Sequence, residues 1–139
     1  MNISDRDRKF LWTRAGSRCS YDYGGIKCNA KLLTHIDGRL TALGDECYIV
    51  GETPKDTRYI DAFPQRITYY NSILLCKKHH KLIDSDPETY TVKVLHEMKD
   101  AHEAVVEQEA RKDPHKPPAR TNDDELLKAI KRAQRETGM

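Results

Sequence analysis

Soft and borderline metal ligands crowd one short stretch of this chain, residues 71–84. An apolar run, 73–75, leads into Cys76, which is followed by His79, His80 and Asp84. Thiolate and imidazole are ligands that zinc prefers, whereas imidazole combined with carboxylate suits a hydrated divalent ion. The stretch therefore predicts metal chemistry, and the remaining elements must position it.

Two upstream cysteines complete a candidate zinc site. Cys19 and Cys28 flank a Gly-Gly turn, while Cys76 and His79 supply the second half. Three thiolates and one imidazole form a common tetrahedral set for structural zinc. The alternative is a group of buried free cysteines beside a fortuitous histidine, because an unpaired cysteine is often a small core residue.

His80 and Asp84 are suited to a second ion. Neighbouring residues on a helix point about 100° apart, so His80 faces away from a zinc held by His79. His80 and Asp84 are four residues apart and share one helical face. Such a pair can hold a catalytic ion whose other positions carry water and a phosphate oxygen, although a surface ion pair is the simpler interpretation of the spacing alone.

Composition allows only a modest core. The chain has 139 residues, of which 37% are apolar and 33% charged, so a metal cross-link would be a useful source of stability. The net charge of +2 does not by itself indicate a nucleic-acid partner. Lys77, Lys78 and Lys81 surround the histidine pair and provide a local basic surface for a polyanion.

The N-terminus and hydropathy favour a cytoplasmic protein without a membrane partner. Met1 is followed by polar and charged residues, not by the apolar core of a signal peptide. No apolar run approaches the roughly 20 residues that span a bilayer. In a reducing compartment, cysteines more often bind metal than pair as disulfides.

Local patterns predict the elements around the site. The chain 4–16 is a helix capped by Ser4 and stopped by Gly16, with Phe10, Leu11 and Trp12 on its buried side. Further predictions are a turn at Asp37-Gly38, a strand over 46–50, a long loop over 51–66, a second strand over 69–75, a short helix over 76–84, and a helix from Thr89 or Thr91 to about Arg111.

The C-terminal region divides into a linker and a helix. Residues 1–112 form the metal-binding domain, 113–120 a proline-rich linker, and 121–139 an amphipathic helix. The helix presents an apolar face to a protein partner, to another subunit or to the body of the domain; that face comprises Leu126, Leu127, Ile130 and Ala133.

Together, these motifs resemble a known family. The chain resembles HNH endonucleases in the order of its motifs. These are Leu-Trp-x-Arg-Ala-Gly-x-Arg-Cys19, then Cys28, then Gly-Asp-Glu-Cys-Tyr-Ile-Val50, then Arg58, and finally Asn-x-Ile-Leu-Leu-Cys-x-x-His-His-x-Leu-Ile-Asp84. The pattern is closest to the zinc-knuckle HNH domains that degrade DNA in bacterial anti-phage defence. The resemblance extends from about residue 8 to 103 and leaves out the C-terminal helix.

The resemblance implies a fold and a chemistry. The expected fold class is α+β, a small ββα-metal core with a structural zinc knuckle and flanking helices. The expected activity is hydrolysis of DNA phosphodiesters with structural Zn²⁺ and one divalent catalytic ion such as Mg²⁺, Mn²⁺ or Ni²⁺. Domains of this kind are often fused to a sensor, so the C-terminal helix is expected to serve a homo-oligomer or a sensor partner.

The resemblance also implies roles for individual residues. Asn71 would brace the loop between the strands, and His80 and Asp84 would hold the catalytic ion. Cys47 lies where some members place a metal-binding acid, and it would either ligate a soft metal or pack. Arg58 would contact phosphate through its two-donor guanidinium, beside the basic surface of Lys77, Lys78 and Lys81.

Position 48 departs from the family pattern. The family places its general-base histidine there, whereas this chain has Tyr48. A phenol of pKa near 10 is ionised about one part in a thousand at neutral pH, which corresponds to a free-energy cost of roughly 4 kcal/mol for forming the base. Tyr48 is a working base, a natural loss of catalysis or an engineered change; His35 as a replacement base would leave the Tyr48 strand without a role.

The alternative function is therefore a catalytically inactive zinc domain. Such a domain would keep the same fold and bind nucleic acid or a protein partner. A metal-dependent cleavage assay separates it from the endonuclease prediction.

Overall fold

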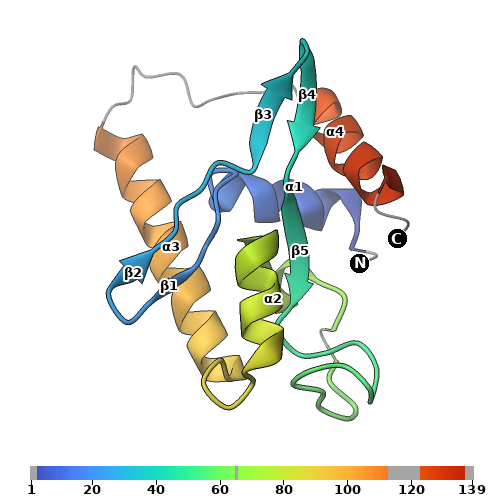
Figure 1. Cartoon of the computed structure of the whole chain (residues 1–139), viewed down its shortest axis with the longest axis vertical. Coiled ribbons are helices and arrows are strands. Elements are labelled where there is room, and N and C mark those ends of the chain that lie inside the picture. The colour runs from blue at the N-terminus through green and yellow to red at the C-terminus, as the bar shows by residue number, and fades with distance from the viewer. Residues whose placement is uncertain (1–2, 65, 113–122, 137–139) are drawn as a thin grey trace.

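The computed structural model describes residues 3–64, 66–112 and 123–136 and belongs to the α+β class (Figure 1). Helices surround small two-stranded antiparallel sheets. The elements in chain order are α1 (Asp5–Arg14), β1 (Asp22–Tyr23), β2 (Ile26–Lys27), β3 (Leu33–Ile36), β4 (Arg39–Ala42), β5 (Gly44–Tyr48), the 3₁₀ turn η1 (Tyr69–Asn71), β6 (Ser72–Cys76), α2 (Lys77–Ser85), α3 (Val92–Lys112) and α4 (Asp123–Glu136).

Capping residues define the helix starts as the sequence predicts. The Ser4 hydroxyl accepts a hydrogen bond from the Asp7 N–H at 3.1 Å, and Gly16 after α1 has a φ of +62°. The Thr91 hydroxyl accepts from the Val94 N–H at 3.2 Å, so Thr91, not Thr89, caps α3. The predicted extents of both helices are confirmed.

The two short hairpins turn at residues with positive φ. Asp37 and Gly38 join β3 to β4 with φ values of 52° and 73°, the geometry of a type I′ turn. The predicted turn is confirmed, although the two flanking strands were not predicted. Each of these two strands is partly buried and partly exposed, so its polar and apolar residues do not alternate strictly, and the pattern that indicates a strand is missing.

The central pair is β5 and β6, joined by the long loop and followed directly by α2. Its antiparallel register runs from Gly44 opposite Cys76 to Tyr48 opposite Ser72. The strand predicted over 46–50 is observed two residues earlier, at Gly44–Tyr48. The predicted strand 69–75 starts too early, because η1 precedes β6 and Asn71 N–H bonds to the Thr68 carbonyl in a turn.

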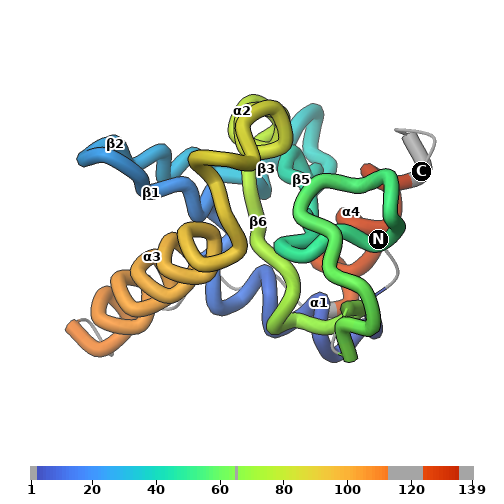
Figure 2. Tube along the Cα trace, turned by 90° about the horizontal axis from the view of Figure 1, so that it is seen from below, coloured from blue at the N-terminus to red at the C-terminus, as the bar shows by residue number. Residues whose placement is uncertain are grey.

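The main core forms around β6. Figure 2 shows β6 between α2 on one side and α1 on the other, with both helices in contact with it. Ile73, Leu74 and Leu75 are fully buried, as are Leu11 and Trp12 of α1. The prediction that Phe10 is buried is wrong.

Phe10 is exposed because it lies about 100° around α1 from Leu11. The Arg6 guanidinium covers its ring at 5.5 Å from the centroid, which gives the exposed face a cation–π contact instead of core packing.

The C-terminal helix α4 packs on the body of the domain. Leu126, Ala129 and Ile130 are buried, and α4 contacts β4 and α1. The sequence left three candidates to cover this apolar face: a protein partner, another subunit or the body of the domain. In the structure, the body of the domain covers it. The predicted linker 113–120 lies outside the described residues, and none of the described helices combines the length and apolarity needed to cross a bilayer.

A buried carboxylate joins α1, β5 and α4. Glu46 accepts from Arg8 Nε at 2.8 Å and Arg8 Nη2 at 2.9 Å, from Trp12 Nε1 at 2.9 Å and from Gln134 Nε2 at 2.7 Å. The Glu46 side chain is 2% exposed. The bidentate geometry and the two further donors satisfy the buried charge.

We therefore predict that Glu46→Gln lowers the free energy of unfolding by about 3 kcal/mol, because it leaves the Arg8 charge buried without its counter-ion. The matched control is Glu107→Gln, which breaks only the exposed i,i+4 pair with Arg111. It is expected to change stability by less than about 0.5 kcal/mol. Equal urea midpoints for the two variants would contradict this role of Glu46.

Candidate functional site

Four predicted ligands converge to form a group that can hold a metal ion such as zinc. The ligand atoms of Cys19, Cys28, Cys76 and His79 all lie within 4.8 Å of one another. His79 Nδ1 is 3.2 Å from Cys76 Sγ and 3.6 Å from Cys19 Sγ. Tetrahedral zinc with Zn–S bonds of about 2.3 Å has ligand–ligand edges of about 3.5–3.8 Å, so the donor set and its spacing fit zinc.

Backbone hydrogen bonds bring the separate halves of this group together. Cys19 N–H donates to the Ala30 carbonyl at 2.9 Å, and Ser20 N–H donates to the Leu74 carbonyl at 2.9 Å. Cys76 ends β6 and is the N-cap of α2, which turns His79 back toward it. The hairpin β1–β2 is thereby fixed to the end of β6.

Aromatic packing holds the His79 ring in place. The Tyr21 ring stacks on it with centroids 3.9 Å apart and an interplanar angle of 3°. The Tyr21 and Tyr90 hydroxyls are 2.7 Å apart. This shell restricts the orientation of the imidazole and keeps its Nδ1 toward the cysteines.

Burial favours the neutral forms of Cys19 and His79 in the metal-free state. It raises the pKa of the Cys19 thiol, and burial followed by the Lys78 charge lowers the pKa of His79. A bound cation favours the thiolates that burial disfavours, while a neutral imidazole is already the ligating form.

A second cluster surrounds His80. Its Nδ1 lies 2.8 Å from Asp45 Oδ2, and its Nε2 lies 3.1 Å from Asp84 Oδ2. The hydrogen bonds with Asp45, Asp84 and Cys47, in that order of size, raise the pKa of His80 to about 12. His80 is thus an imidazolium between two carboxylates when no metal competes for it.

Asp45 is the member of this cluster that the sequence-based prediction missed. Lys77 Nζ contacts its Oδ1 at 2.8 Å, and the hydrogen bond with His80 is the largest cause lowering the pKa of Asp45. The available signal was strand alternation, because residues two apart on a strand share a face. Asp45 therefore lies on the same face of β5 as Cys47, which the sequence had marked as a candidate ligand.

The two predicted residues Cys47 and Tyr48 are the last two of β5 and differ in burial. Cys47 is buried on the α2 side, where burial raises the pKa of its thiol and His80 opposes that change. Glu46 points toward α1 and α4. Tyr48 is half-buried at the end of β5, and its hydroxyl oxygen is buried. Asp45 and Cys47 thus contribute to the His80 cluster from β5.

The guanidinium of Arg58, expected from the resemblance to contact phosphate, is engaged by protein groups in this structure. The side chain is 4% exposed. Its Nε donates to the Ile49 carbonyl at 2.9 Å, its Nη1 to the Ile83 carbonyl at 2.9 Å and its Nη2 to Asp84 Oδ1 at 2.8 Å. The physical reason is local. Arg58 lies within a loop that folds onto α2, and its guanidinium donates to the Ile49 carbonyl at one end of that loop and to the Ile83 carbonyl of α2.

Asn71 occupies the bracing position expected of it. The side chain is buried; its Oδ1 accepts from Val50 N–H at 2.8 Å, and its Nδ2 donates to the Val50 carbonyl at 2.9 Å and the Arg66 carbonyl at 2.8 Å. Both ends of the long loop are therefore held by one amide.

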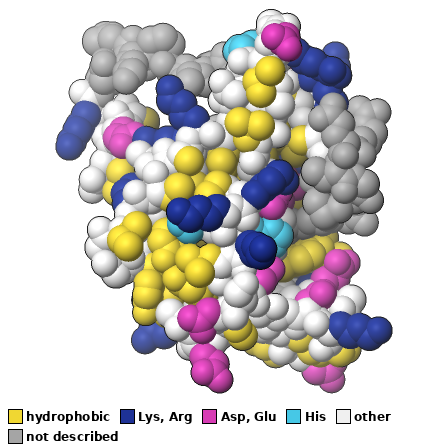
Figure 3. Space-filling model, viewed as in Figure 1, with side chains coloured by type: hydrophobic (Ala, Val, Ile, Leu, Met, Phe, Trp, Pro, Cys, Tyr) yellow, Lys and Arg dark blue, Asp and Glu magenta, His cyan; other side chains and the backbone are white. Residues whose placement is uncertain are grey.

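Basic side chains gather over α2 together with histidine and acidic groups (Figure 3). Lys78 and Lys81 are exposed, whereas the exposed Lys77 pairs with Asp45. His35 is exposed on the separate β3–β4 hairpin. The α2 surface thus combines open cations with the His80 cluster.

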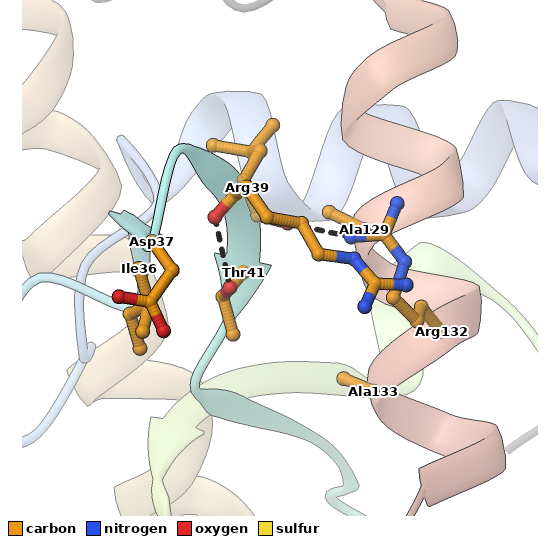
Figure 4. A pocket seen from close by; sticks show the side chains of 8 residues that line it. Ile36, Asp37, Arg39, Thr41, Ala129, Arg132 and Ala133 are labelled. Carbon is orange, nitrogen blue, oxygen red and sulfur yellow. Dashed lines mark hydrogen bonds between the residues drawn. The ribbon is translucent and has the colours of Figure 1, made fainter.

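A hollow of about 300 Å³ lies elsewhere, between the β3–β4 hairpin and α4 (Figure 4). Arg39 and Arg132 line it, and Arg132 Nη1 donates to the Leu40 carbonyl at 3.0 Å. This contact anchors α4 to the hairpin.

No protein-family model matches this chain, and no curated protein is significantly similar to it. Function is therefore inferred from the residues and their geometry.

Zinc removal is expected to unfold the knuckle. We predict close to one equivalent of zinc in protein purified without chelators, and a fall in melting temperature of at least about 10 °C after chelation, because the metal would cross-link the β1–β2 hairpin to the start of α2. Cys28→Ser should reproduce both losses. Less than half an equivalent of zinc, together with an unchanged melting temperature after chelation, would contradict the zinc site. The four residues would then be free cysteines beside a histidine.

Proposed function

We propose that this chain is a metal-dependent endonuclease of the HNH type that hydrolyses DNA phosphodiester bonds, in the role of a bacterial defence nuclease. The observation that carries the proposal is the cluster of His80, Asp84 and Cys47 at the junction of β5 with α2. The strand–loop–strand–helix order β5, β6, α2 agrees with the ββα-metal core expected from the sequence resemblance.

The donor set of the cluster is suited to a divalent ion. His80 Nε2 and the Asp84 carboxylate lie side by side, and their side chains are 35% and 42% exposed. Imidazole and carboxylate suit Mn²⁺ or Ni²⁺, carboxylate suits Mg²⁺, and a Cys47 thiolate would favour softer ions. A bound ion would supply electrophilic stabilisation of a phosphate oxygen and of the leaving 3′ oxygen.

The chain's own residues would position the substrate around this pair. Lys78 and Lys81 offer exposed ammonium groups to the DNA backbone, which accounts for binding without base-specific contacts. Asn71 fixes the loop, and Arg58 holds one oxygen of Asp84 from behind. The DNA partner is thus met at α2, not through the apolar face of α4.

The weakest part of the machinery is proton removal from the attacking water. An imidazole is a ready base at neutral pH, whereas an unperturbed phenol is ionised only about one part in a thousand. A slow enzyme is therefore expected.

The direct test is plasmid nicking by zinc-loaded protein with Mg²⁺, Mn²⁺, Ni²⁺ or added Zn²⁺. Nicking is expected with at least one ion, and His80→Ala should reduce it at least about 100-fold because the ion loses its nitrogen ligand. His35→Ala, an exposed histidine on the hairpin, is the matched control and should leave the rate unchanged.

No nicking with any of the ions would remove the endonuclease proposal. Retained binding of the same plasmid would then support the alternative, a catalytically inactive zinc domain that binds nucleic acid.

Tyr48→His is expected to increase metal-dependent cleavage by about 10²-fold or more, because it restores a base whose pKa lies near the working pH. The rate should be measured from pH 6 to 9, where an imidazole gives a plateau above its pKa. Tyr48→Phe is the control that removes the hydroxyl alone. If the histidine variant is slower than the parent and Tyr48→Phe is inactive, the phenol itself is the catalytic group.

A further inference from the structure

Asp45 lies behind His80, on the inner side of the cluster. Its Oδ2 is 2.8 Å from His80 Nδ1, while Asp84 approaches the opposite ring nitrogen, Nε2, at 3.1 Å. The Asp45 side chain is only 14% exposed, compared with 42% for Asp84. The two carboxylates therefore differ in access to anything that arrives from solvent.

The fold fixes Asp45 from two directions. It lies on β5 opposite Leu75, next to the strand end from which α2 begins. Its second oxygen, Oδ1, is held by Lys77 Nζ at 2.8 Å. With both oxygens engaged by the first turn of α2, Asp45 has little freedom to turn outward.

We propose that Asp45 is a positioning residue that accepts the hydrogen bond from Nδ1–H of His80, so that Nε2 is the nitrogen presented, together with Asp84, to a divalent ion. This inference rests on the proposed metal site at His80. A carboxylate or carbonyl behind a ligating histidine selects the tautomer and ring orientation and makes the imidazole a stronger ligand. The residue contributes to metal affinity without touching the ion.

Asp84 shows the same arrangement from the other side of the site. Its Oδ1 is held by the buried Arg58 guanidinium at 2.8 Å, which leaves Oδ2 toward His80 Nε2. Each of the two outward-facing ligands is thus held by a residue that solvent barely reaches. A direct ligand role for Asp45 would compete with its contact to Lys77 through Oδ1 or to His80 through Oδ2.

The test measures Mn²⁺ binding to zinc-loaded protein by electron paramagnetic resonance, with no DNA present. Asp45→Ala is expected to weaken Mn²⁺ binding 10- to 100-fold, and the isosteric Asp45→Asn, which retains an acceptor oxygen, less than that. Asp37→Asn, an exposed aspartate in the β3–β4 turn, is the matched control and should bind Mn²⁺ like the parent.

A second readout reports on the imidazole itself. In the parent protein with a diamagnetic divalent ion such as Mg²⁺, the ¹⁵N shifts of His80 should show a protonated Nδ1 and a metal-facing Nε2. In Asp45→Ala this single tautomer should be lost or averaged with the other.

The outcomes separate this inference from the proposed function. If His80→Ala binds Mn²⁺ as tightly as the parent, the metal site itself fails. If His80→Ala weakens binding but folded Asp45→Ala and Asp45→Asn do not, and the tautomer is unchanged, only the positioning role of Asp45 is overturned.

Discussion

The convergence of Cys19, Cys28, Cys76 and His79 is the constraint on which the rest of the structure depends. It brings the β1–β2 hairpin to the junction of β6 with α2, two regions separated by more than a third of the chain. A domain with 37% apolar residues has a small core, so a metal ion bound by this group would be an important source of stability. The same junction fixes the direction in which α2 leaves the sheet.

The direction of α2 determines what His80 can do. Because His79 faces the cysteines, the next residue along the helix faces β5 and meets Asp45 and the Cys47 side of the strand. The structural group and the proposed catalytic group are thus adjacent in sequence and opposite in orientation. Loss of the first would also disperse the second.

Buried polar contacts carry much of the remaining organisation. Glu46 joins α1, β5 and α4, Arg58 ties the long loop to α2, and Asn71 closes the ends of that loop. Each of these side chains is satisfied by several partners, which makes the buried polar group specific for one arrangement of the elements. Arg58 also pairs with Asp84, so the loop is fixed to the side chain that lies beside His80.

The sequence by itself determined the helices, the four candidate metal ligands and the pairing of His80 with Asp84, because caps, ligand types and i,i+4 spacing are local properties. It also located β5 and β6 to within a few residues. Only the tertiary structure decided that Asp45 stands behind His80, that Arg58 is buried and that the apolar face of α4 is covered by its own domain. These contacts join residues 26 or more positions apart, and no local pattern encodes which distant surface a side chain will meet.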